Sequence, residues 1–207
     1  MTKRITISTL DAMKASGDKF VMITAYDATF ARLASEAGAE TILVGDSLGM
    51  VLQGHETTIP VSLDAMTYHT ECVARARPHS LIVADLPFMS FSNADDTLHA
   101  STRLMQAGAQ MVKLEGGIWL SDSIHRLVER GVPVCAHLGL TPQSVNVFGG
   151  YRVQGRTPKE AKSILADAVE IQDAGASLLV LECIPAELAA DISSKLDIPV
   201  IGIGAGS

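Results

Sequence analysis

The chain has 207 residues, enough for one sizeable hydrophobic core. Its composition is 47% hydrophobic with 4% aromatic residues, which indicates a packed α/β protein and excludes a disordered chain. Sixteen Lys and Arg residues stand against 23 Asp and Glu, a net charge of −7 without a basic cluster, so we expect no nucleic-acid partner.

The cysteines and the N-terminal residues indicate the cellular compartment of the protein. Cys72, Cys135 and Cys183 are odd in number and lack metal-binding spacing, so we expect reduced core thiols. The opening MTKRITISTL has no long apolar stretch behind its basic residues, which argues against a signal peptide. No apolar run is long enough to span a bilayer. We therefore expect a cytoplasmic protein without a membrane partner.

Short apolar runs alternate with helical patterns along the chain. Most runs are rich in β-branched residues and lack strict alternation, which predicts strands buried on both faces of a parallel sheet. We expect strands at residues 20–25, 41–45, 81–84, 111–114, 132–136, 178–181 and 198–203. We expect helices at residues 29–36, 62–77, 94–106, 120–130, 158–173 and 185–196. The segment Thr157-Pro158-Lys159-Glu160 predicts a capping box.

This alternation leaves two architectures, a doubly wound sheet or a (β/α)8 barrel. The first strand runs into Tyr26-Asp27 and not into a glycine-rich phosphate loop, which argues against a dinucleotide-binding sheet. The chain ends after the seventh predicted strand, whereas a typical barrel takes roughly 250 residues. We expect one α/β domain over residues 1–207, a (β/α)8 TIM barrel truncated after strand 7 and lacking its last βα unit.

The tripeptide Ala-Gly-Ala occurs three times, starting at residues 37, 107 and 174. Each copy leads into an apolar run that ends on an acid: Asp46, Glu115 or Glu182. A glycine that closes a helix, followed by a turn and a buried strand, explains the repeat. The acids have no packing role, so they indicate a site at the carboxyl ends of the strands, where barrels place their active sites.

Polar residues at the predicted strand ends form a larger set. Its members are Asp46, Ser47, Asp85, Lys113, Glu115, His137 and Glu182. Any one of them alone is explained by a helix cap, a salt bridge or another structural role. Four carboxylates at one rim, however, would raise each other's pKa unless a cation lay among them. Lys113 supplies one charge, and oxygen ligands without Cys or His partners favour Mg²⁺ over zinc.

Such a metal site suits a 2-oxo acid, which chelates through its carboxylate and keto oxygens. The metal would act as a Lewis acid that stabilises an enolate. A carboxylate outside the metal shell could remove the adjacent C–H proton as a general base. The residues alone therefore point to carbon–carbon bond chemistry, without choosing the base.

Three further segments leave alternatives open. Residues 138–157 form a long segment of the kind that is usually functional or mobile, but an oligomer contact or a short helix with flanking turns explains it equally well. We expect His55, in a polar loop, to lie on the surface without a role. The glycines at 202, 204 and 206 form a weak phosphate-loop pattern that a flexible strand exit also explains.

Five motifs resemble the ketopantoate hydroxymethyltransferase family, in order and over nearly the whole chain. They are GDSLGMVLQGHETT (45–58), ADLPFMS (84–90), MVKLEGG (111–117), AHLGLTPQSVNVFGGYRVQGR (136–156) and LVLECIP (179–185). The resemblance implies a barrel related to those of phosphoenolpyruvate mutase and isocitrate lyase. It also implies transfer of a hydroxymethyl group from 5,10-methylenetetrahydrofolate to 3-methyl-2-oxobutanoate, giving 2-dehydropantoate for pantothenate synthesis.

The resemblance assigns roles by motif. Asp46, Asp85 and Glu115 would hold Mg²⁺, directly or through water. Asp46 and Asp85, with Ser47 and Lys113, would bind the 2-oxo acid. These assignments agree with the magnesium site expected from the strand ends.

The remaining roles fall to two residues. Glu182 would be the catalytic proton acceptor that removes the C3 proton, and His137 would support it near the substrate. Small-molecule partners would be the 2-oxo acid and the folate, and the family implies a homo-oligomer, typically a decamer.

Two other readings stay open. The first is a Mg²⁺-dependent lyase or mutase of the related barrels, which usually carry a reactive cysteine in a mobile loop; no cysteine here lies in a long predicted loop. The second is an inactive, truncated barrel that acts only in assembly.

Overall fold

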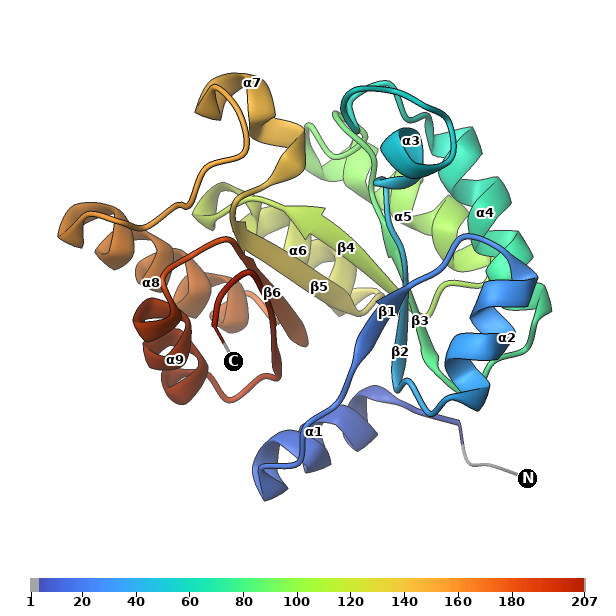
Figure 1. The fold of residues 1–207 in the computed structure, drawn as a ribbon, viewed down its shortest axis with the longest axis horizontal. Coiled ribbons are helices and arrows are strands. Elements are labelled where there is room, and N and C mark those ends of the chain that lie inside the picture. Colours follow the sequence, from blue (N-terminus) through green and yellow to red (C-terminus); the bar gives the residue numbers. More distant parts are fainter. Residues whose placement is uncertain (1–3, 207) are drawn as a thin grey trace. The chain divides into compact units, whose positions relative to one another are not determined.

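The computed structural model describes residues 4–206, which form strands and helices in alternation (Figure 1). Within these residues the strands are β1 (Met22–Thr24), β2 (Thr41–Val44), β3 (Leu81–Asp85), β4 (Met111–Glu115), β5 (Val134–Gly139), β6 (Leu178–Glu182) and β7 (Val200–Ile203). All seven are parallel, and their order in the sheet follows the chain from β1 to β7. A doubly wound sheet would reverse direction at a switch point, so this order confirms the (β/α) barrel class.

Helices follow the strands. The longer ones are α2 (Ala28–Glu36), α4 (Leu63–Arg75), α5 (Ala94–Gln106), α6 (Ser121–Glu129), α8 (Pro158–Asp173) and α9 (Ala186–Lys195). The short ones are α3 (Leu48–Val51), α7 (Val145–Phe148), and the 3₁₀ turns η1 (Ile118–Leu120) and η2 (Pro142–Ser144). No helix within residues 4–206 is long and apolar enough to cross a membrane.

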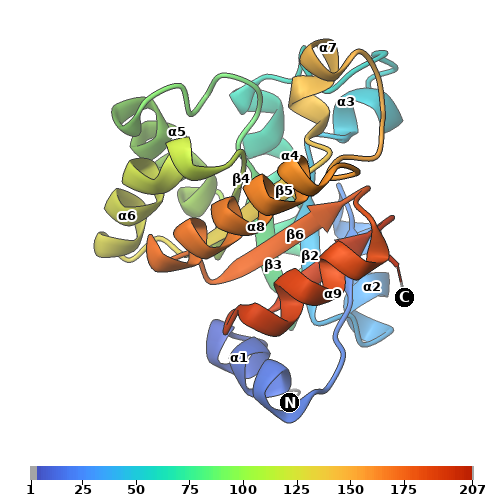
Figure 2. The same ribbon diagram turned by 90° about the vertical axis from the view of Figure 1, so that its left-hand side faces the viewer.

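The chain forms two compact units, the first ending at Lys113 and the second beginning at Leu114, so the boundary lies inside β4. In the first unit α4 packs against β2, β3 and the two helices α2 and α5 (Figure 1). In the second unit α8 packs against β5, η1 and α9, and Figure 2 shows α8 and α9 running beside β6.

The three Ala-Gly-Ala copies do what the sequence predicts. Each closes a helix ahead of a strand, at α2 and β2, α5 and β4, and α8 and β6. Their glycines Gly38, Gly108 and Gly175 have φ of 96°, 111° and 105°. Only glycine adopts such angles without strain, so the tripeptide is a helix stop.

Burial differs between the middle and the ends of the sheet. Every residue of β3 and β4 is buried, as expected. The expectation of full burial is wrong for β1 and β7, where Ile23 is 38% and Ile203 54% exposed. Within the described residues these strands stand at the ends of the strand order, each beside one other strand.

Some sequence expectations need correction. Helix α1 (Ile7–Ser16) lies ahead of β1 and was not expected, because its apolar residues do not share one face; Leu10 is its buried residue. A capping box at Thr6 and a left-handed Gly17 delimit it. The expectation of core thiols holds for Cys135, whereas Cys72 and Cys183 are half-buried.

Candidate active site

The first unit brings together two carboxylates and a lysine. Asp46 follows β2, Asp85 ends β3, and Lys113 lies opposite Asp85 in the β3–β4 register. The Asp46 backbone N–H donates to Asp85 Oδ2 over 3.0 Å, and Lys113 Nζ lies 2.6 Å from Asp85 Oδ1. All three residues are at most 4% exposed. The parallel pairing of β2, β3 and β4 therefore gathers the predicted residues of this unit.

The charge and chemistry of this group fit a hard divalent cation. Lys113 carries one positive charge against two buried carboxylates, and buried charges need compensation. Within residues 4–206 no group of three or more His, Cys, Asp or Glu side chains gathers as a complete ligand set. Mg²⁺ does not require one, because it is commonly held by one or two carboxylates and keeps several waters. Two carboxylates such as those of Asp46 and Asp85 match the protein share of such a site.

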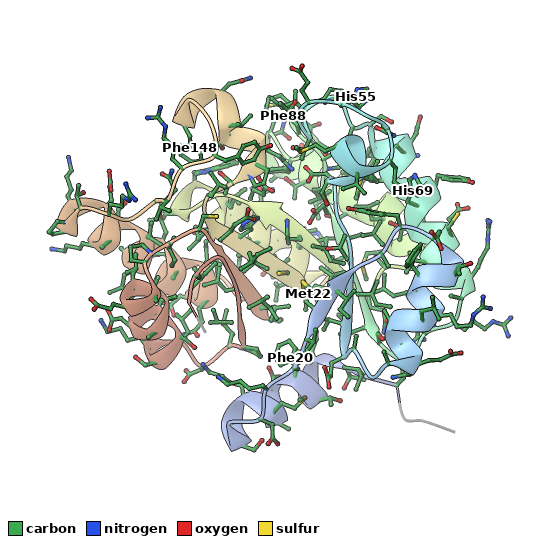
Figure 3. The ribbon with its side chains drawn as sticks, in the orientation of Figure 1. Phe20, Met22, His55, His69, Phe88 and Phe148 are labelled. Atoms are coloured by element: carbon green, nitrogen blue, oxygen red, sulfur yellow. The ribbon has the colours of Figure 1, made fainter. Side chains whose placement is uncertain are left out.

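Ser47 lies beside the two carboxylates and shares a hydrogen bond with Tyr26. Tyr26 Oη and Ser47 Oγ are 2.9 Å apart. His69 on α4, labelled in Figure 3, holds the Tyr26 segment through a 2.8 Å contact between its Nδ1 and the Tyr26 carbonyl oxygen. Burial raises the pKa of Tyr26, the Ser47 hydrogen bond offsets part of that rise, and the negative charges of Asp85 and Asp46 add to it. The phenol is therefore protonated at neutral pH.

The second unit places His137 between two glutamates. His137 Nδ1 lies 3.4 Å from Glu115 Oε1, and its Nε2 lies 3.4 Å from Glu182 Oε2. The side chains of His137 and Glu115 are 3% exposed, whereas that of Glu182 is 21% exposed. Glu182 is therefore the more accessible acid of this group.

The segment 138–157 is tied to both glutamates. The Gln143 backbone N–H donates to Glu115 Oε2 over 3.1 Å, and the Leu140 N–H donates to the Glu182 carbonyl oxygen over 2.8 Å. Gly139 has φ of 91°, and a Cβ there would overlap the Glu182 carbonyl oxygen. The segment contains η2 and α7, which confirms the expectation of a short helix with flanking turns. It also fixes the acids of the site.

The sequence did not predict two residues that contact the predicted site residues, Tyr26 at Ser47 and Gln143 at Glu115. Tyr26 lies two residues after the end of β1, and its side chain carries no charge that would mark it in the sequence. Gln143 acts through its backbone N–H, which no side-chain pattern reveals. His55, also labelled in Figure 3, is exposed in its loop, as expected.

Comparison with solved structures shows the class of fold. A putative phosphonomutase from Burkholderia cenocepacia J2315 superposes with a TM-score of 0.72 at 19% identity, covering 95% of this chain and 83% of that one. A 2,3-dimethylmalate lyase, a member of the PEP mutase/isocitrate lyase superfamily, superposes at 0.63 with 14% identity, covering 97% and 81%. The chain therefore has the barrel fold of that superfamily.

Sequence comparison then narrows the class to a family. The sequence model of ketopantoate hydroxymethyltransferase matches residues 4–207. A 3-methyl-2-oxobutanoate hydroxymethyltransferase of Pseudomonas fluorescens (strain Pf0-1) is 58% identical over 203 residues, 98% of this chain and 76% of the relative. The 3-methyl-2-oxobutanoate hydroxymethyltransferase of Saccharophagus degradans is 55% identical over 206 residues, which cover 100% of this chain and 76% of the relative. The chain belongs to the ketopantoate hydroxymethyltransferase family of enzymes.

Proposed function

We propose that this chain transfers a hydroxymethyl group from 5,10-methylenetetrahydrofolate to 3-methyl-2-oxobutanoate with Mg²⁺, in the synthesis of pantothenate. The methylene carbon leaves N5 and N10 of the folate and forms a bond to C3, which loses a proton. Water supplies the hydroxyl group, and the C3 proton and the remaining water proton go to the two folate nitrogens. The products are 2-dehydropantoate and tetrahydrofolate. The observation that carries the proposal is the buried Asp46–Asp85–Lys113 group, which offers two carboxylates to a metal and a cation to a substrate carboxylate.

Residues of the first unit would bind the metal and the 2-oxo acid. Asp46 and Asp85 would hold the metal, directly or through water. When bound, Mg²⁺ supplies the Lewis-acid charge that stabilises negative charge developing on the 2-oxo acid. Lys113 and the Ser47 hydroxyl would orient the acid.

Residues of the second unit would move the proton. Glu182 would accept the C3 proton at its carboxylate. His137 would stabilise and orient that carboxylate through its Nε2, 3.4 Å from Glu182 Oε2, while its Nδ1 lies 3.4 Å from Glu115 Oε1. The 21% exposure of the Glu182 side chain supports its choice over the buried Glu115.

The competing hypothesis of a lyase loses support at Cys183. Burial raises the pKa of Cys183, and the negative charge of Glu182 raises it further. A reactive cysteine needs a lowered pKa, because the thiolate is the nucleophile.

The assignment of the base is tested with Glu182→Gln. We expect 2-dehydropantoate formation to fall by roughly a thousandfold or more, because general-base catalysis typically contributes up to ~10⁴-fold and the amide cannot accept a proton. Binding of 3-methyl-2-oxobutanoate, measured by calorimetry, should persist. The matched control is Glu187→Gln on the exposed first turn of α9, which should keep wild-type turnover. Near-normal turnover in Glu182→Gln would overturn the assignment.

A further inference from the structure

The second unit contains a cavity that the proposed chemistry has not used. It has a volume of about 310 Å³ and lies between the carboxyl ends of β4 and β5, the 138–157 segment and residues 160–167 of α8. Its lining includes Gly116, Trp119, Leu138, Phe148 and Asp167. A volume near 300 Å³ is at the small end of ligand sites and suits a bicyclic heterocycle.

Two consecutive glycines form the floor of this cavity. A Cβ on Gly116 would lie 2.5 Å from the Trp119 ring, and a Cβ on Gly117 would lie 2.5 Å from the Asp167 carboxyl carbon. Side chains at these positions would displace the indole and the carboxylate. The pair therefore allows an aromatic ring and an acid to approach the backbone together, directly after Glu115.

Two aromatic side chains line the cavity, and one of them is exposed. Trp119, the single tryptophan of the chain, is 60% exposed. Phe148, labelled in Figure 3 at the end of α7, is a second ring in the lining. Tryptophan at a cavity with an open face offers a stacking surface to a flat ligand.

The polar lining selects the charge of that ligand. Asp167 and Glu160 lie on one face of α8, seven residues apart, and none of the described residues that line the cavity is basic. Glu160 accepts the Thr157 N–H in the helix cap, and Asp167 Oδ1 accepts the Ile118 N–H over 3.0 Å. The second Asp167 oxygen can accept from a ligand. The lining thus favours N–H donors over anions.

The position of the cavity places a ligand beside the proton-transfer group. Its wall residues Gly116 and Leu138 directly follow Glu115 and His137, and Gly139 pairs with Glu182 in the β5–β6 register. Active sites of barrels occupy this strand end.

We infer that this cavity binds the pterin ring of the folate co-substrate. Trp119 stacks on the ring, and the second carboxylate oxygen of Asp167 accepts a hydrogen bond from its 2-amino or N3–H group. The anionic glutamate tail extends away from the acidic lining. This inference rests on the proposed function only for the identity of the donor.

The test measures binding of 5-formyltetrahydrofolate, a stable reduced folate, by isothermal titration calorimetry. Asp167→Asn retains an oxygen for the Ile118 N–H but adds a donor that faces the pterin donors. Trp119→Leu removes the stacking surface, and Trp119→Phe should restore most of it. We expect the Asn and Leu variants to bind roughly tenfold or more weakly. Matched controls are Asp173→Asn, exposed on the same helix, and Ile118→Ala, 55% exposed beside Trp119.

Kinetics separate a pocket from a merely structural role. In Asp167→Asn the KM for methylenetetrahydrofolate should rise by a larger factor than the KM for 3-methyl-2-oxobutanoate, whereas general damage would raise both. Reduced-folate affinity equal to that of the controls, or no affinity in the wild-type enzyme, would overturn the inference. Binding that depends on Asp167 in an enzyme without transfer activity would sink the proposed function and leave the pocket standing.

Discussion

Ser47 is the residue whose orientation depends most visibly on a neighbour outside the predicted set. Its hydroxyl lies 2.9 Å from Tyr26 Oη, and Gly45 leaves room for it, since a Cβ there would come within 2.7 Å of Ser47 Oγ. The raised pKa of Tyr26 keeps its proton in place. Tyr26 is therefore a positioning residue for the hydroxyl that would bind the 2-oxo acid.

Tyr26→Phe tests this positioning. The variant loses one hydrogen bond at Ser47, so the KM for 3-methyl-2-oxobutanoate should rise about two- to tenfold, the range of a single net hydrogen bond. Steady-state kinetics with saturating folate measures it. Tyr68→Phe is the matched control, because Tyr68 is 60% exposed on α4. Identical KM values in the two variants would contradict the role of Tyr26.

Among single residues, the sequence predicted charged side chains that gather at strand ends in each unit, and it missed the uncharged groups that contact them. Asp85 and Lys113 stand out because charged residues rarely end buried strands without a purpose. Tyr26 and the Gln143 N–H do not stand out, since one resembles a core aromatic residue and the other is common to every backbone. Their roles follow only from three-dimensional distances.

Among the elements, the helix stops before β2 and β4 use the same tripeptide in different surroundings. A Cβ on Gly38 would meet no atom within 4 Å beyond its chain neighbours, whereas a Cβ on Gly108 would lie 2.5 Å from Ala74 Cβ on α4. Both glycines have positive φ, 96° and 111°. They therefore share a conformational cost on substitution and differ in a steric one.

We predict that Gly108→Ala destabilises the protein more than Gly38→Ala. Both variants should lose about 1 kcal/mol of unfolding free energy from the left-handed backbone. Gly108→Ala should lose a further ~1–3 kcal/mol, because α5 and α4 must separate to admit the methyl group. Urea unfolding measures both. Equal losses of unfolding free energy in the two variants would contradict a steric cost from the contact with α4.

The elements that the sequence predicted well are those with strong periodicity or a clear stop. Helix α8 was predicted at its observed bounds because Thr157 caps it and an Ala-Gly-Ala stop ends it. Helix α1 was missed, because capping by Thr6 and not an apolar face defines it. The exposure of β1 and β7 was also missed, since burial depends on neighbouring strands that local sequence does not contain.

For the molecule as a whole, the sequence predicted the class of fold and the family. The alternation of strands with helices allowed two architectures, and the order of the strands decided between them. The division at Lys113 was not foreseen, because it lies inside the continuous strand β4 and no change in composition marks it. Each unit carries part of the predicted set, a buried acid–lysine group in one and the His137 group in the other.

The proposed mechanism depends above all on one step, the metal-assisted removal of the C3 proton, which precedes transfer and needs no folate. The most direct test is exchange of that proton into deuterated water, followed by NMR of 3-methyl-2-oxobutanoate with the wild-type enzyme. We expect exchange with Mg²⁺ and without folate, loss of exchange after chelation by EDTA, and recovery when Mg²⁺ is restored. Exchange that continues in metal-free enzyme, or none with Mg²⁺ present, would contradict the mechanism.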